Sequence, residues 1–198
     1  MNTKSLGEIL IEVSARHVHL SQPHLDELFG KGYKLTKLKD LSQPKLFAAQ
    51  ETITIQHKNK TIPRVRIIGP CRKQTQVELS LTDAFNLGIK IPIRTSGDLN
   101  NTPGATLIGP KGKIDLDKGI IASYRHIHVS NKQALKLGIK NKDLIYVQTQ
   151  GPRAIIFKKV LVRVDPSFSW AMHIDTDEGN AAGIVRNAKG MILKEINE

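Results

Sequence analysis

Two short His-x-His segments carry the side chains most suited to chemistry in this chain. They are residues 16–21 (RHVHLS) and 125–130 (RHIHVS). On a β-strand the side chains at i and i+2 point to the same face, so each pair of imidazoles would lie together. One such pair can be an ordinary hydrogen-bonded or solvent-facing feature, but two nearly identical copies favour metal binding. The sequence therefore predicts that both segments supply metal ligands.

An internal repeat adds further metal-binding side chains at an equivalent position. Residues 80–90 (SLTDAFNLGIK) match residues 130–140 (SNKQALKLGIK), and in each copy a Ser suits the N-cap of a short helix that ends at a Gly. The residue two places before the cap is of a metal-binding type in four copies: His19, Glu78, His128 and His173. Five of the seven histidines thus belong to this feature, and His24 and His57 are expected at the surface.

The available ligands are imidazoles and a carboxylate, with no cluster of cysteines. Such a set favours zinc at sites that keep an open position, although cobalt or iron could use the same ligands. One three-ligand grouping is His17, His19 and Glu78, and a second is His126, His128 and His173. The repeat alone leaves open which ligands pair. Open coordination positions imply a catalytic rather than a structural role.

A loop with two cations leads into the strand that holds Glu78. It spans residues 69–78 (GPCRKQTQVE) and includes Arg72, whose planar guanidinium is suited to binding phosphate. The single cysteine of the chain, Cys71, lies beside it, and an acyl-carrying role for its thiol stays open as an alternative.

The elements that must position these residues are mostly strands. Apolar and β-branched runs recur with short gaps at residues 8–13, 52–55, 65–68, 76–79, 144–147, 154–157 and 160–164. Between them lie only short helical patterns, at residues 82–87 and 132–137. We therefore expect a mainly β protein with short α-helices, built as small barrels rather than a long parallel sheet.

Composition and charge restrict the class of partner. The net charge of +12 fits nucleic acid, small anionic substrates or a lysine-rich genome, and the spread of Lys and Arg along the chain argues against nucleic acid. The sequence contains no run of about 18 apolar residues, the length that a helix needs to cross a membrane. The N-terminus leaves no room for a signal peptide, so a cytoplasmic location is expected.

These motifs closely resemble the PduL-type phosphotransacylases, also called phosphate propanoyltransferases. The resembling segments are residues 13–21, 39–44, 47–52, 69–78, 96–98, 125–128 and 172–178. The resemblance implies two small β-barrel domains with helical caps and a metal site in the cleft between them. The first domain would span residues 16–123 and the second residues 124–198, with the N-terminal strand 1–15 added to the second. A homodimer is the implied assembly.

The resemblance also assigns site residues. His17, His19 and Glu78 would hold the zinc that takes the coenzyme A sulfur, and His126, His128 and His173 a second zinc with waters. Arg72 would bind phosphate, and the coenzyme A contacts would be Ser14, Ala15, Arg16, Arg66 and Asn180. Glu51 matches a glutamate that approaches the metal when coenzyme A is absent, and Ser96 lies in a further matching segment.

The activity implied is exchange of coenzyme A and inorganic phosphate on a short acyl group, giving an acyl phosphate without a covalent acyl-enzyme. Whether acetyl-CoA or propanoyl-CoA is preferred stays open. A zinc hydrolase with the same ligands and a non-enzymatic binding module are the competing classes. The N-terminal extension that targets some relatives to microcompartments is missing, which makes the microcompartment lumen a less supported location.

Overall fold

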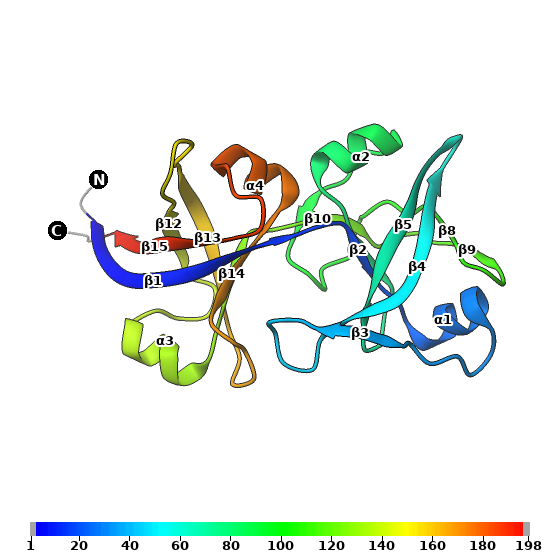
Figure 1. Ribbon diagram of the computed structural model, residues 1–198, viewed down its shortest axis with the longest axis horizontal. Helices are drawn as coiled ribbons and strands as arrows, with labels where there is room; N and C mark the ends of the chain where they lie inside the picture. The colour runs from blue at the N-terminus through cyan, green and yellow to red at the C-terminus, as the bar shows by residue number, and fades with distance from the viewer. Residues whose placement is uncertain (1–2, 196–198) are drawn as a thin grey trace. The chain divides into compact units, whose positions relative to one another are not determined.

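The computed structural model describes residues 3–195 of the chain, and these form two compact units. One unit consists of the N-terminal segment up to Ser14 together with the segment from Tyr124 onward, and the other spans Ala15–Ser123. Strands dominate both units and the helices are short, so the predicted mainly β fold is confirmed (Figure 1). Among the described residues no helix is both long and apolar enough to span a membrane.

The unit made from the two ends of the chain, here called the barrel unit, is a closed six-stranded barrel. Its strand order is β1-β14-β11-β13-β12-β15, closed by pairing of β15 with β1. The strands are β1 (Thr3–Ser14), β11 (His126–Val129), β12 (Leu144–Gln148), β13 (Ile156–Val164), β14 (Ala171–Asp175) and β15 (Asn187–Glu195). Its helices are α3 (Asn131–Leu137) and α4 (Thr176–Ala182).

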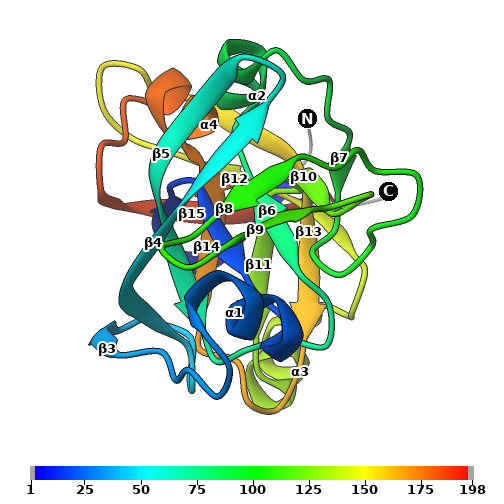
Figure 2. The same cartoon turned by 90° about the vertical axis from the view of Figure 1, so that its right-hand side faces the viewer.

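The unit of residues 15–123, here called the sheet unit, is a nine-stranded sheet. The strand order is β7-β10-β6-β2-β5-β4-β8-β9, and β3 also pairs with β4. Its strands are β2 (His17–His19), β3 (Lys37–Asp40), β4 (Phe47–His57), β5 (Lys60–Gly69), β6 (Gln76–Glu78), β7 (Ile93–Arg94), β8 (Thr106–Ile108), β9 (Lys113–Asp115) and β10 (Ile120–Ser123). Its helices are α1 (Gln22–Phe29) and α2 (Leu81–Leu87), and Figure 2 shows its long β4/β5 hairpin.

Each unit buries its own apolar core along alternating strand positions. In the sheet unit Val18 and Val77 are fully buried, and in the barrel unit Ile127 and Met172 are fully buried. Because successive side chains on a strand point to opposite faces, the residues flanking these positions project away from the core. The metal-binding side chains are those flanking residues.

A β-bulge corrects one expectation about the strands. The runs 154–157 and 160–164 were expected as separate strands, but β13 is continuous from Ile156 to Val164. Lys159 has a φ of 55°, and it lets Phe157 and Val160, three residues apart, both face the core. Arg64, with a φ of 56°, does the same between Ile62 and Val65 in the other unit.

Candidate metal centres

The same strand arrangement holds the histidine pair in each unit. In the sheet unit β2 lies between β5 and β6, with His17 opposite Glu78. In the barrel unit β11 lies between β13 and β14, with His126 opposite His173. Each central strand runs parallel to one neighbour and antiparallel to the other in both units, so the sequence repeat corresponds to a repeated three-strand arrangement.

Two groups of donor side chains result. One is His17, His19 and Glu78, and the other is His126, His128 and His173. Within each group one ligand atom per residue lies within 4.8 Å of the others. The groups coincide with the two groupings expected from the sequence, whose roles in binding stay predictions.

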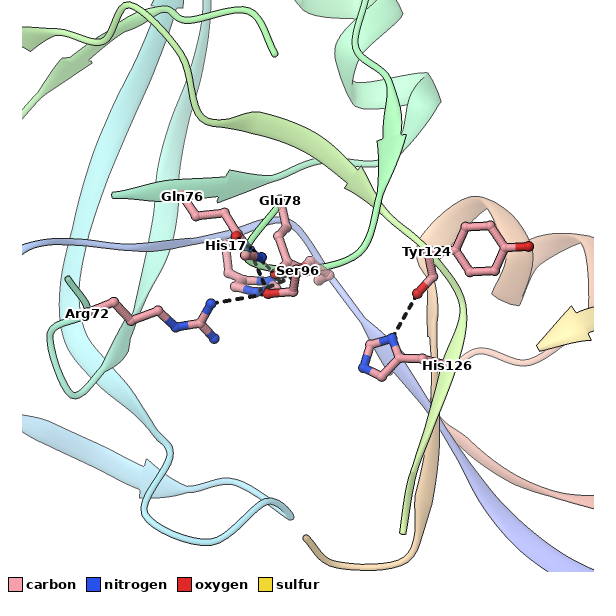
Figure 3. A network of polar contacts seen from close by, with 9 residues as sticks. His17, Arg72, Gln76, Glu78, Ser96, Tyr124 and His126 are labelled. Atoms are coloured by element: carbon pink, nitrogen blue, oxygen red, sulfur yellow. Dashed lines mark hydrogen bonds and ion pairs between the residues drawn. The ribbon is translucent and has the colours of Figure 1, made fainter. Parts of the chain in front are cut away.

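The first histidine of each pair has its tautomer fixed by the backbone. Nδ1 of His17 lies 2.8 Å from the carbonyl oxygen of Ala15. Nδ1 of His126 lies 2.8 Å from the carbonyl oxygen of Tyr124 (Figure 3). Nδ1 must donate these hydrogen bonds, which leaves Nε2 with its lone pair available to a metal. Both rings are buried, at 6% and 8% exposure.

Electrostatics in the sheet unit favour an ionised carboxylate among the imidazoles. Burial acts to raise the pKa of Glu78, but His17, His19 and Arg72 outweigh it and hold that pKa well below its usual value. Burial acts to lower the pKa of His17, but the Glu78 carboxylate, 3.6 Å from Nε2, outweighs it and raises that pKa. Burial and the neighbouring cations lower the pKa of His19.

These residues fit a bound divalent cation. Nδ1 of His19 is buried without a hydrogen-bond partner, which is unfavourable unless another group uses its lone pair. A neutral imidazole beside an ionised carboxylate is the donor set that zinc takes at open sites. The structure thus supplies donor atoms of the types that such a cation binds.

A polar network connects Glu78 to the phosphate-binding candidate. Gln76 donates to Glu78 Oε1 at 2.6 Å and to the Ser96 hydroxyl at 2.8 Å, and its own Oε1 accepts from the Gly97 amide. Arg72 donates to the same Ser96 hydroxyl at 3.2 Å (Figure 3). Ser96 therefore holds the guanidinium in the neighbourhood of the donor group.

In the barrel unit a helix capping box supports the second group. Asp175 caps α4 by accepting from the Glu178 amide, and Glu178 accepts from the Asp175 amide. Arg125 pairs with Glu178 at 2.7 Å and so ties the residue before His126 to this helix. Burial raises the pKa of Glu178, although Arg125 opposes the shift. The ring of Phe168 lies 4.1 Å from that of His128.

An equivalent ion pair between strand and helix occurs in the sheet unit. Arg16 donates to Asp83 at 2.7 Å, and Asp83 is the third residue of α2, as Glu178 is of α4. Both arginines thus connect a His-x-His strand to the helix that follows the third donor. The sequence contains all four residues, but their pairing depends on which strands are neighbours.

The residues expected to contact coenzyme A differ in their surroundings. Arg66 donates to the carbonyls of Ala49 and Gln50, and Ser14 is the last residue of β1, in register with Asp175. Ala15 and Asn180 are exposed. Coenzyme A binding by Ser14, Ala15, Arg16, Arg66 and Asn180 stays a prediction.

Three other expectations concern residues outside the donor groups. Glu51 accepts from Tyr33 and from the Thr36 amide, so its carboxylate anchors a loop within the sheet unit. His24 and His57 are half-buried rather than at the surface, because His24 bonds Thr75 and Nδ1 of His57 is buried.

A β fold with two histidine-rich donor groups, one of them linked to an arginine, defines a protein suited to metal-assisted chemistry on an anionic substrate. The family model described as phosphate propanoyltransferase matches residues 10–185. Similar proteins named phosphate propanoyltransferase occur in Thermotoga maritima, at 51% identity over 88% of this chain and 83% of the relative, and in Lachnoclostridium phytofermentans, at 52% over 88% and 82%. Another, from Clostridioides difficile, is 46% identical over 94% of this chain and 90% of its own length.

The chain belongs to the phosphate propanoyltransferase family. This confirms the family expected from its motifs, and it confirms the expected class of enzyme, an acyltransferase.

Proposed function

We propose that the protein exchanges coenzyme A and inorganic phosphate on propanoyl-CoA, or on acetyl-CoA, to give the acyl phosphate and free coenzyme A. The observation that carries the proposal is the network from Arg72 through Ser96 and Gln76 to Glu78, because it links a side chain suited to binding phosphate to a group that could hold a metal ion. The family membership of the chain supports the same reaction.

Arg72 would bind the phosphate dianion by paired hydrogen bonds, with Ser96 fixing the guanidinium. His17, His19 and Glu78 would hold one zinc ion, and His126, His128 and His173 a second. Zinc, when bound, supplies Lewis acidity that stabilises the thiolate leaving from the acyl carbon. Gln76 keeps one oxygen of Glu78 occupied, which leaves the other to face His17.

Direct transfer is favoured over an acyl-enzyme on Cys71. Burial, with Asp26, raises the pKa of the Cys71 thiol, so the thiol is protonated at neutral pH and is a poor nucleophile. Cys71→Ala is therefore expected to keep its activity and its metal. Loss of nearly all activity with metal content intact would instead support the acyl-carrier route.

The decisive test is the release of free thiol from acetyl-CoA and propanoyl-CoA, with and without inorganic phosphate. Release should require phosphate and should yield acyl phosphate. His128→Ala should abolish it, while His57→Ala, a histidine outside both donor groups, should not. Equal release without phosphate would identify a thioester hydrolase, and the faster substrate would name the preferred acyl group. The homodimer stays a family-based proposal that sedimentation would test.

A further inference from the structure

The loop that carries Arg72 connects β5 to β6 and is attached to the segment that follows β2. The loop spans residues 70–75. Within it, the Arg72 amide donates to the carbonyl of Leu20 at 2.8 Å, and Ser21 and Arg72 form an isolated parallel β-bridge. The backbone of the arginine is therefore held by the residues that come directly after the His-x-His strand.

Thr75 makes a second connection between this loop and the same segment. Its hydroxyl oxygen accepts from the Ser21 amide at 2.9 Å and lies 2.8 Å from Nδ1 of His24, in the first turn of α1. The hydroxyl also donates to Oγ of Ser21 at 3.4 Å. Thr75 is only 5% exposed, so without its hydroxyl the Ser21 amide would lose its acceptor in the interior of the unit.

These contacts hold Arg72 at its backbone, and Ser96 holds it at its tip by accepting from the guanidinium at 3.2 Å. A long side chain places its charge accurately when the residues around it fix both ends. The donor group does not depend on the same contacts. Gln76, the residue after Thr75, begins β6 and is paired with His19 on β2, so the sheet itself keeps β6 in place. Loss of the Thr75 hydroxyl should therefore loosen the loop and leave the donor group as it is.

From these observations we propose that Thr75 is a positioning residue for phosphate. Its hydroxyl holds the loop so that the guanidinium of Arg72 meets the phosphate dianion in one orientation. The inference rests on the proposed function, in which Arg72 binds phosphate. Accurate placement matters for such a transfer, because a displacement of about 1 Å in a binding group can cost about 100-fold in rate. Thr75 thus acts on the reaction through Arg72, without contacting the reacting atoms.

Steady-state kinetics of the zinc-loaded chain test the assignment. Thr75→Val removes the hydroxyl and keeps the shape of the side chain. It should raise KM for phosphate by about 10-fold, while KM for propanoyl-CoA and the amount of bound metal stay as in wild type. Thr75→Ser, which retains a hydroxyl, should return KM for phosphate towards the wild-type value.

Thr149→Val is the matched control. The buried Thr149 hydroxyl also accepts from a backbone amide, that of Ile155, but it lies in the barrel unit. Both valine variants leave a buried amide without its acceptor, so both should unfold more easily than wild type. Thr149→Val should nevertheless keep both KM values. Calorimetric titration with inorganic phosphate measures the affinity without turnover, and it should show weaker binding to Thr75→Val than to Thr149→Val.

An unchanged KM for phosphate in Thr75→Val, or equal increases in both KM values, would overturn the assignment, because the hydroxyl would then serve the fold alone. Failure of Thr75→Ser to recover phosphate affinity would do the same. If the wild-type chain releases no thiol in response to phosphate, the proposed function fails and not the role of Thr75 within it. If Thr75→Val does not fold, His24→Ala, which removes another partner of the same hydroxyl, should raise KM for phosphate in the same direction, and an unchanged value there would count against the proposal.

Discussion

Gln76 is a residue whose role depends entirely on its neighbours. Its amide orients Glu78 and contacts both Ser96 and the Gly97 amide. We expect Gln76→Leu to weaken metal binding in the sheet unit by about 10–100-fold, since the carboxylate loses its outer partner. Competition with a chromophoric chelator measures this. Gln56→Leu, which loses only a contact with the Lys58 carbonyl, should bind as wild type.

Glu51 has a pH-dependent structural role. Burial acts to raise its pKa, but donors from Thr36 and Tyr33 outweigh burial and lower that pKa. A depressed carboxyl pKa stabilises the fold above the unfolded value of about 4.3, and this stabilisation is lost as pH falls through the folded value. Glu51→Gln should therefore reduce the free energy of unfolding by about 1 kcal/mol at pH 7, a value discounted for partial exposure. Urea unfolding at pH 7 and near pH 3 measures the difference, which should be smaller at the lower pH.

At the residue scale, the sequence pointed to residues of distinctive type and spacing. The histidines and Glu78 stood out because a repeat placed them at one position. Gln76 carried no such signal, because a lone glutamine on a strand has no distinctive chemistry. Only the pairing of β2 with β6, which sets Gln76 opposite His19, brings it to the donor group of the sheet unit.

Among the elements, the helices differ in how their first turns are held. Ser80 and Ser130 cap α2 and α3 by accepting from Asp83 and Gln133, but Ser21 makes no such bond at α1. Ser80→Ala and Ser130→Ala should each lower the free energy of unfolding by about 1 kcal/mol. Chemical denaturation measures both losses. Ser21→Ala cannot act through a cap, so an equal loss there would show that the serines matter through burial or through other hydrogen bonds, such as the one that the Ser21 hydroxyl accepts from Thr75.

The ion pairs of Arg16 and Arg125 predict that each His-x-His strand and the helix that its arginine contacts stabilise one another. A double-mutant cycle on Arg125→Ala and Glu178→Ala should give a coupling energy of about 1–2 kcal/mol, because the carboxylate is largely buried and hydrogen-bonded within the capping box. Thermal unfolding of the four proteins supplies the cycle. If the two losses of unfolding free energy simply add, the ion pair contributes little to stability, as is usual for exposed pairs.

Local patterns were sufficient to predict strands and short helices, because burial alternates along β4, β5 and β12 and glycines end the helices. The continuity of β13 through Lys159 was not predicted. A non-glycine residue with positive φ leaves no trace in composition, so two apolar runs separated by lysines were interpreted as two strands.

At the scale of the whole molecule, the two units differ in how the chain builds them. The sheet unit is one continuous segment, whereas the barrel unit needs both ends of the chain. A fragment of residues 15–123 should therefore fold cooperatively and bind one metal ion. A fragment of residues 124–198 lacks β1 and leaves the edges of β14 and β15 unpaired, so it should not fold alone. Circular dichroism and metal titration of both fragments measure this, and cooperative folding of the second would show that β1 is dispensable.

The arrangement of β1 also sets an order of events during synthesis. Among the described strands β1 pairs with β14 and β15, which come after all the strands of the sheet unit in the chain. The intervening segment can complete its own sheet while β1 waits without partners. The nascent chain must therefore keep β1 from unwanted pairing until β14 and β15 have been made, and charges such as those of Glu8 and Glu12 on this strand disfavour such pairing.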